Sequence, residues 1–315
     1  MSGIPAPHAP AGLAGAPVSR TPARATVRFA ALGDSLTEGV GDPVQGGWRG
    51  WAALLAEGLA GPGQDVDFRN LAVAGALSAD VHAHQAVAAA DFRPDLASVV
   101  VGVNDTLRSS FDIRRLAARL DEVCALLAGG GAVLLTACLP DPGTALGLPG
   151  PLRRPLARRQ QAVNTVVHAL SARYGAVHLH ASDRAWTEDR SLWSVDRLHP
   201  GERGHRRLAA GFHRLLAERD LALGSPPGRE PRQPTPTRAA AVLWLATEGT
   251  GWLARRSTDL LPQLLGLATA EIGHRARGTS GQLDARAERA LREALDGLPR
   301  TSFLRGSVPR ARMEG

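Results

Sequence analysis

The sequence predicts an α/β protein: a three-layer α/β/α sandwich on a five-stranded parallel sheet, followed by a helical C-terminal extension. Five short apolar runs alternate with segments of helical periodicity. The runs are residues 27–32, 66–72, 96–103, 132–138 and 176–179. Runs that are apolar on both faces are typical of parallel strands covered by helices on both sides. A proline-rich segment then separates this region from a second helical one.

Helical patterns fill the intervals between the apolar runs, and they lie at about 47–60, 78–91, 111–128, 152–173 and 201–219. Five strand–helix units make a doubly wound domain over residues 27–224. In such a sheet the ligand site lies outside the carboxyl ends of the strands. Residues 1–26 precede the domain and are predicted to be a disordered leader, because prolines recur at positions 5, 7, 10, 17 and 22.

The segment 225–238 reads SPPGREPRQPTPTR, which has five prolines and no large apolar side chain, and it is predicted to be a linker. Residues 239–315 are expected to form short helices. One carries an apolar stripe, with Asp259 as its cap and Pro262 in the first turn; the stripe comprises Leu260, Leu261, Leu264, Leu265, Ala268 and Ile272. Glu288 and Arg292 are spaced for an ion pair on a further helix. The role of this extension stays open: an intramolecular contact is favoured over a homodimer contact, a lid or a membrane contact.

Composition excludes several classes of protein. The formal net charge is +7, but all 37 basic residues are arginines spread along the chain, so no nucleic-acid partner is expected. No apolar run reaches the length of a transmembrane helix. The leader lacks the features of a signal peptide, so a cytoplasmic protein is expected. Two cysteines, Cys124 and Cys138, are too few for a disulfide scaffold and are expected to be core residues.

A candidate nucleophile follows the first predicted strand, in the sequence Gly33-Asp34-Ser35-Leu36. A serine at the carboxyl end of the sheet lies where an exposed nucleophile is needed. A serine after a strand is also a common helix cap, and this alternative stays open for Ser35 alone.

Candidate partners for Ser35 follow other strands. Gly75 lies beyond the second strand and Asn104 beyond the third. A backbone N–H and a side-chain amide there are suited to an oxyanion that forms during acyl transfer, although each is also an ordinary turn residue. Asp196 precedes His199 by three residues, so one loop can present both side chains. Serine needs such a base, itself oriented by a third group.

These features together resemble the SGNH hydrolases, also called GDSL esterases/lipases, over residues 27–220. The matching motifs are GDSL at 33–36, a glycine at 75, Gly-x-Asn-Asp at 102–105 and Asp-x-x-His-Pro at 196–200. The resemblance implies a three-layer α/β/α fold with Ser35, His199 and Asp196 as catalytic residues. It implies an oxyanion hole from Ser35, Gly75 and Asn104, and neither metal nor organic cofactor.

The expected function is hydrolysis of a small-molecule carboxylic ester through an acyl-enzyme. An acyltransferase with the same residues and a carbohydrate O-acetylesterase remain alternatives, and a catalytically idle binding protein is disfavoured because the site residues are complete. The Pro/Gly-rich segment 139–156 is expected to shape the substrate cleft, and Arg153 and Arg154 could meet an anionic substrate, although solvated arginines are favoured.

Two further residue groups have alternative interpretations. The pairs His82/His84 and His178/His180 are spaced as metal ligands, but no cysteine or carboxylate cluster accompanies them in the sequence, so surface or core histidines are favoured. Four tryptophans flank the motifs and are candidates either for the pocket lining or for the core: Trp48, Trp51, Trp186 and Trp193.

Overall fold

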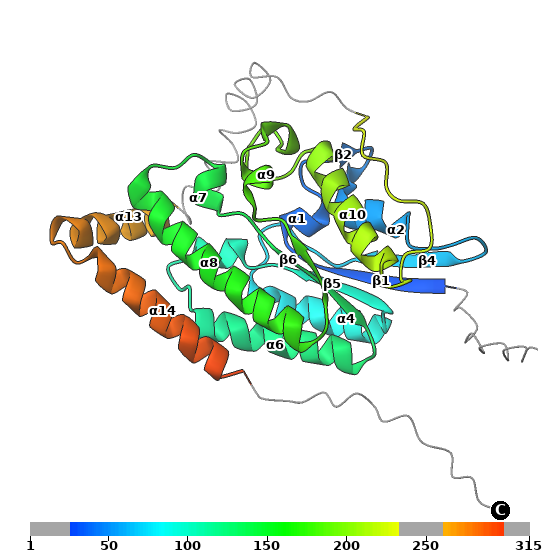
Figure 1. Cartoon of the computed structure of the whole chain (residues 1–315), viewed down its shortest axis with the longest axis horizontal. Helices are drawn as coiled ribbons and strands as arrows, with labels where there is room; N and C mark the ends of the chain where they lie inside the picture. Colours follow the sequence, from blue (N-terminus) through cyan, green and yellow to red (C-terminus); the bar gives the residue numbers. More distant parts are fainter. Residues whose placement is uncertain (1–25, 233–260, 299–315) are drawn as a thin grey trace, which may run out of the picture.

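The computed structural model describes residues 26–232 and 261–298 (Figure 1). A five-stranded parallel sheet lies at its centre, in the order β4-β1-β5-β6-β7. The strands are β1 (Thr26–Gly33), β4 (Asp65–Asn70), β5 (Leu96–Val100), β6 (Val133–Cys138) and β7 (Val177–His180). The strand order reverses beside β1, because β4 lies on one side of it and β5 on the other. The crevice between β1 and β5 is therefore the position where a doubly wound sheet binds ligands.

Helices cover both faces of the sheet, which confirms the predicted three-layer sandwich (Figure 1). One face packs against α2 (Gly50–Ala56) and α10 (Glu202–Ala217). The other packs against α4 (Ala86–Phe92), α6 (Ile113–Gly129) and α8 (Gly150–Arg173). Strand β1 shows why both faces are apolar: Phe29 and Ala31 enter one core, whereas Ala30 and Leu32 enter the other.

Two of the predicted helices differ from the observed elements. The helix expected from residue 47 begins only at Gly50, because a short hairpin of β2 (Pro43–Val44) and β3 (Gly47–Trp48) comes first. Gly46, in the turn of this hairpin, has a positive φ angle of 87°, which is not helical. The helix expected over 78–91 is interrupted by a π-helical turn, η1 (Val81–Gln85), between α3 (Ser78–Asp80) and α4.

Short helices occupy the loops of the domain. They are α1 (Ser35–Glu38), α5 (Val103–Thr106), α7 (Pro142–Ala145), α9 (Arg184–Thr187) and the 3-10 turn η2 (Arg190–Leu192). Within the described residues no helix combines the length and the apolar character needed to cross a bilayer.

The C-terminal region contains two helices, α13 (Leu261–Ala276) and α14 (Ser280–Asp296), which lie along α8 and α6 (Figure 1). The predicted cap Asp259 and Leu260 lie outside the described residues. The predicted stripe is not buried as a unit, since Leu265 and Ile272 are 54% and 53% exposed.

Charged groups join the C-terminal helices to α8. Glu271 is only 2% exposed. It lies 3.5 Å from Arg154 Nε and 3.3 Å from Arg158 Nη2. Arg158 Nε also lies 2.7 Å from Asp284. The expected intramolecular contact is thus present, and it combines these ion pairs with apolar contacts of α14, in which Ala294 is buried in the core of the domain.

Candidate active site

Ser35 lies directly after β1, at the carboxyl edge of the sheet. Asp34 is the cap of helix α1, since its carboxylate accepts a hydrogen bond from Leu36 N at 3.1 Å. Ser35 is therefore not needed as a cap, and its hydroxyl is available to other partners. Gly33 has φ of 155°, and a side chain there would collide with the Val100 carbonyl oxygen. Gln85 from η1 further holds Gly33 by bonds to both its N–H and its carbonyl, at 2.8 and 2.9 Å.

A tight loop between η2 and α10 brings His199 to Ser35. His199 Nε2 lies 2.9 Å from Ser35 Oγ, and His199 Nδ1 lies 2.6 Å from Asp196 Oδ2. The second oxygen of Asp196 accepts hydrogen bonds from Ser194 Oγ and from the N–H groups of Leu198 and His199. The loop closes by a bond from Ser194 N to the His199 carbonyl at 2.8 Å. These bonds hold Asp196 in position through one carboxylate oxygen, and the other oxygen orients the imidazole of His199.

The two carboxyl groups beside Ser35 have opposite pKa shifts. Burial acts to raise the pKa of Asp196, but the hydrogen bonds from His199 and Ser194 and the proximity of His199 outweigh it and lower that pKa to about 2. Burial raises the pKa of Asp34 to about 6, against the bond from Leu36 N and the proximity of His199. Asp196 is therefore the ionised partner of His199 at neutral pH, and Asp34 is the weaker acid.

Asn104 lies on α5, beyond the adjacent strand β5, and faces the same pocket as Ser35 and His199. Its amide nitrogen lies 3.3 Å from Asp34 Oδ2 and 3.2 Å from the Ala76 carbonyl. Gly75 precedes Ala76, is partly buried and has φ of 85°, but it does not line this pocket. Ser35, His199, Asp196 and Asn104 are thus brought together, whereas Gly75 is linked to them through Ala76.

The pocket beside Ser35 is apolar and small, with a volume of about 80 Å³. Its walls include Leu139, Pro140, Pro142 and Ala145 from the Pro/Gly-rich segment, as the sequence predicts. Of the four flanking tryptophans, two line the pocket, one lies in the core and one is exposed. Trp186 and Trp193 line the pocket. Trp51 stacks on Phe212 in the core, and Trp48 is 44% exposed on β3.

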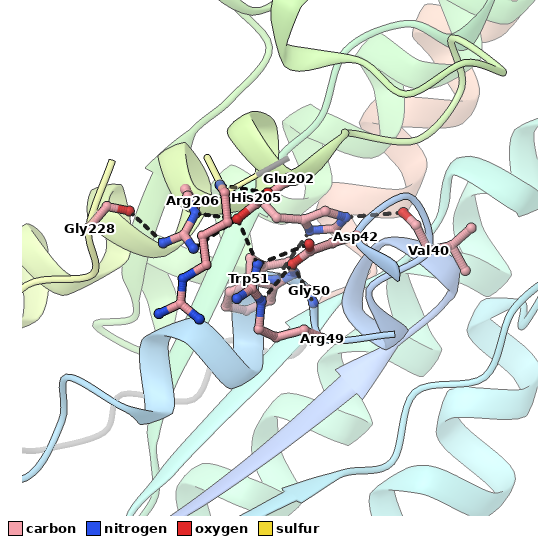
Figure 2. Close-up of polar contacts among 10 residues, drawn as sticks. Val40, Asp42, Arg49, Gly50, Trp51, Glu202, His205, Arg206 and Gly228 are labelled. Atoms are coloured by element: carbon pink, nitrogen blue, oxygen red, sulfur yellow. Dashed lines mark hydrogen bonds and ion pairs between the residues drawn. The ribbon is translucent and has the colours of Figure 1, made fainter. Parts of the chain in front are cut away.

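A buried polar network joins the first turns of α10 to the segment 40–51, which follows α1 (Figure 2). Asp42 is fully buried and accepts bonds from Arg49 Nε and Nη2 at 2.9 and 3.1 Å. Arg49 also bonds Glu202, the first residue of α10, at 2.9 Å. Arg206 bonds the same Glu202 oxygen. The α10 side of this network, which begins at Glu202, lies immediately beyond His199 and Pro200 in the chain.

His205 completes the network on α10 (Figure 2). Its Nδ1 accepts a bond from Trp51 N at 3.2 Å, so its Nε2 carries the proton donated to the Val40 carbonyl at 3.1 Å. Burial lowers the pKa of His205 to about 4, which keeps the ring neutral. The Asp-x-x-His motif did not indicate this network, because its members are separated by about 150 residues.

The histidine pairs have different surroundings. His82 forms an ion-pair contact with Glu122 at 2.6 Å and is partly exposed, and His84 is exposed. His178 and His180 meet Cys138 and His168 in the folded chain, a grouping that their spacing in the sequence did not indicate. Arg154 forms ion pairs with Glu271 and Asp284, so its charge is directed at the C-terminal helices and not at a substrate.

A doubly wound α/β/α domain in which Ser35, His199 and Asp196 are linked by hydrogen bonds is the arrangement expected of a serine hydrolase, and comparison with known proteins agrees on the hydrolase class. Residues 31–207 match the GDSL-like lipase/acylhydrolase family, so the chain belongs to that family and is an esterase of the SGNH/GDSL type. No curated protein sequence matches the chain significantly.

Solved structures share the fold. An acetylxylan esterase from Geobacillus stearothermophilus superposes with a TM-score of 0.50 and 18% identity, covering 60% of this chain and 94% of that one. An α/β hydrolase from the metagenome of Lake Arreo, Spain, superposes with a TM-score of 0.49 and 20% identity. The match covers 63% of this chain and 97% of that one. The first of these likenesses supports the fold, and the identities are too low to carry a substrate.

Proposed function

We propose that the chain hydrolyses short-chain carboxylic esters through an acyl-enzyme formed on Ser35. The observation that carries the proposal is the bond from Ser35 Oγ to His199 Nε2 at 2.9 Å, with His199 Nδ1 held 2.6 Å from Asp196. This is the geometry in which a neutral imidazole takes the serine proton as the hydroxyl attacks a carbonyl carbon.

The reaction proceeds in two halves. Ser35 Oγ bonds to the carbonyl carbon while its proton passes to His199 Nε2, and the carbonyl oxygen becomes an oxyanion. The N–H group of Ser35 and the Asn104 amide, both of which line the pocket, stabilise that charge, and the N–H of Gly75 is the further donor that the family motifs imply. The tetrahedral intermediate collapses, and the departing alkoxide takes the proton from His199. A water molecule then repeats the sequence and releases the acid and free Ser35.

Asp196 keeps the proton-accepting tautomer of His199 in place and stabilises its imidazolium form. Its low pKa of about 2 keeps it ionised at neutral pH, so it can offset the positive charge that His199 gains during the reaction. Asn104 must leave Asp34 and the Ala76 carbonyl, or share its two N–H groups with them, to bond the oxyanion.

Pocket size supports the choice of a short acyl group. The cavity volume is about 80 Å³, and Leu139, Pro142 and Trp186 enclose it. A small cavity with such bulky apolar walls suits an acetyl or propionyl group better than a long acyl chain. Acetyl groups on a carbohydrate and on a small alcohol share this requirement.

The test compares p-nitrophenyl acetate, butyrate, octanoate and palmitate, with acetylated xylo-oligosaccharide as a further substrate, for wild type and Ser35→Ala. Turnover is expected to fall by up to about 10⁶-fold in Ser35→Ala and to be unchanged in Ser191→Ala, which removes a partly exposed hydroxyl that bonds Asp189. Acetate should be the best of the four esters. Ser35-independent turnover refutes the proposal, and a preference for palmitate refutes the short-acyl part.

The acyltransferase alternative uses the same residues. Adding a competing alcohol to the assay distinguishes the two: a hydrolase releases acid as its main product, whereas an acyltransferase forms the new ester in proportion to the alcohol.

A further inference from the structure

A second cluster of chemically reactive side chains lies on the sheet, apart from the Ser35 site. Cys138, His168, His178 and His180 each offer one ligand atom, and these atoms all lie within 4.8 Å of one another. The rings of the three histidines are in contact, with centroids 4.3 to 4.9 Å apart. His180 Nδ1 lies 3.7 Å from Cys138 Sγ.

The fold itself creates this cluster. Cys138 on β6 is paired in register with His180 on β7, and Thr136 is paired with His178 two residues earlier. Because side chains alternate along a strand, both pairs face the same side of the sheet. Helix α8 covers that side and supplies His168 and, three residues later, Ser171. Three elements therefore converge on one point.

Hydrogen bonds orient the innermost histidine. His178 Nδ1 lies 2.9 Å from Thr136 Oγ1 and 3.1 Å from Ser171 Oγ. The opposite ring nitrogen, Nε2, is buried and has no hydrogen-bond partner among the described residues. An orphaned buried nitrogen costs free energy unless it binds something. A histidine that bonds through one nitrogen and leaves the other free has the arrangement of a metal ligand with its supporting shell.

We propose that Cys138, His168, His178 and His180 form a tetrahedral site for a divalent transition-metal ion, zinc above all. Three imidazole nitrogens and one thiolate suit Zn²⁺, which prefers four nitrogen and sulfur ligands. Zn–N and Zn–S bonds of 2.0–2.3 Å place the ligand atoms roughly 3.3–3.7 Å apart. Closing from at most 4.8 Å therefore needs side-chain movements of about 1 Å.

Binding of a metal ion at this site releases a proton from the protein. The Cys138 thiol loses its proton to the solvent when the Cys138–metal bond forms. Ser182 Oγ lies 3.3 Å from Cys138 Sγ and can donate to the resulting thiolate.

The site is structural in character, because four protein ligands leave no open position for substrate. It joins β6, β7 and α8 just behind the ester pocket, since Leu139 and Ala181 follow Cys138 and His180 and line that pocket. Metal binding therefore stabilises the fold, and its measurement does not depend on esterase activity.

The experiment uses the full chain without a histidine tag, freed of metal by a chelator. Zn²⁺ binding is measured by calorimetry in buffers of different ionisation enthalpy, and Co²⁺ is used as a spectroscopic substitute. We expect one ion per chain, about one proton released from Cys138, and the visible and near-ultraviolet bands of tetrahedral, thiolate-bound cobalt. The melting temperature should rise by roughly 5–10 °C when Zn²⁺ is at 100 times its Kd.

Matched variants locate the ion. His168→Ala and His180→Ala change exposed residues and are expected to fold, and each should weaken Zn²⁺ binding by more than about 100-fold. Cys138→Ala should abolish the thiolate band and the proton release. His84→Ala and Cys124→Ala, which lie elsewhere, should bind as wild type does.

Three results would overturn the site. They are the absence of stoichiometric binding to wild type, binding that survives unchanged in both His168→Ala and His180→Ala, and binding that is lost in His199→Ala. The last result would place the ion on the histidine beside Ser35.

Discussion

Ser35 Oγ and His199 Nε2 lie 2.9 Å apart although 164 residues separate them in the sequence. The fold achieves this because β1 ends at the point where the strand order reverses, and the loop before α10 returns to the same edge of the sheet. Neither residue is placed by local structure alone. The consequences for activity and stability can be tested at the residues that hold this pair.

Asp196→Asn is expected to lower kcat by about 10⁴-fold while the protein stays folded. The asparagine fills the same space, but its amide group can favour the wrong tautomer of His199, whose Nδ1 now faces Asp196 Oδ2 at 2.6 Å. Steady-state kinetics on p-nitrophenyl acetate measure the change. Asp183→Asn, which alters a carboxylate that caps α9, serves as the control and should keep full activity. Retention of activity in Asp196→Asn would remove Asp196 from the mechanism.

Asn104→Ala is expected to lower kcat by roughly 10²–10³-fold with little change in KM, because an oxyanion donor acts mainly in the transition state. The comparison variant is Asn164→Ala, whose side chain instead bonds Leu139 N and the Leu139 carbonyl in the pocket wall, at 3.0 and 2.8 Å. That variant should change KM more than kcat. Equal effects of both variants on kcat and KM would argue against an oxyanion role for Asn104.

Asp42→Ala is expected to destabilise the fold by about 3 kcal/mol or more, because it removes one partner of a buried ion pair and leaves Arg49 with Glu202 alone. Activity per folded molecule should also fall, by up to about 10²-fold, since the network supports the loop before α10. Urea unfolding and kcat measure the two effects. In the exposed pair Arg214–Glu218, Glu218→Ala should cost no more than about 0.5 kcal/mol, and a similar cost for Asp42→Ala would refute the argument.

Much of the fold follows from apolar patterning, whereas the supporting interactions do not. The five strands and the motif residues Ser35, Asn104, Asp196 and His199 are predictable, because each depends on a short local pattern, after a strand for Ser35 and Asn104 and before helix α10 for Asp196 and His199. The hairpin before α2 was missed, since two-residue strands carry no periodicity.

Long-range polar contacts were invisible for a different reason. The bond from Gln85 to Gly33 and the meeting of His168 with Cys138 each need the folded chain to bring distant segments together. A glutamine or histidine on a helix gives no signal of its partner until the register of the strands is known. The prediction that the apolar stripe on α13 is buried was wrong for the same reason. Among the α13 side chains that the structure describes, the buried one is Glu271, whose charge is paired with Arg154 and Arg158 of α8.

Arg158→Ala is expected to loosen the C-terminal helices without loss of the central fold. It leaves Glu271, which is 2% exposed, with the more distant Arg154, and it leaves Asp284 without its 2.7 Å contact. Limited proteolysis should cut between α10 and α14 faster than in wild type. Arg292→Ala, in a solvent-exposed pair with Glu288 at 3.9 Å, should be cut at the wild-type rate. Equal rates for all three proteins would mean that apolar contacts such as Ala294 hold the helices.

Asp34 is expected to make the stability of the fold fall between about pH 4 and pH 6. Its pKa is raised from 3.8 to about 6 by burial, so the native state keeps a proton that the unfolded state releases. The stabilisation is full below pH 3.8 and is lost as the pH rises through 6, by about 3 kcal/mol in total. Asp196 affects stability in the opposite direction and over a lower pH range. Its pKa is about 2 in the folded protein, so the stability that it contributes is lost as the pH falls from 3.8 toward 2.

The measurement that separates them is urea unfolding of wild type and Asp34→Asn at intervals from pH 4 to pH 6.5. The amide cannot ionise, so the variant should gain stability relative to wild type as the pH rises. Asp189→Asn is the control, because hydrogen bonds from Ser191 lower the pKa of Asp189 and place its titration below this window. Parallel profiles of stability against pH for wild type and Asp34→Asn would refute the prediction. They would show that Asp34 ionises in the folded protein at its ordinary pKa, so that Asn104 bonds a carboxylate over most of this pH range.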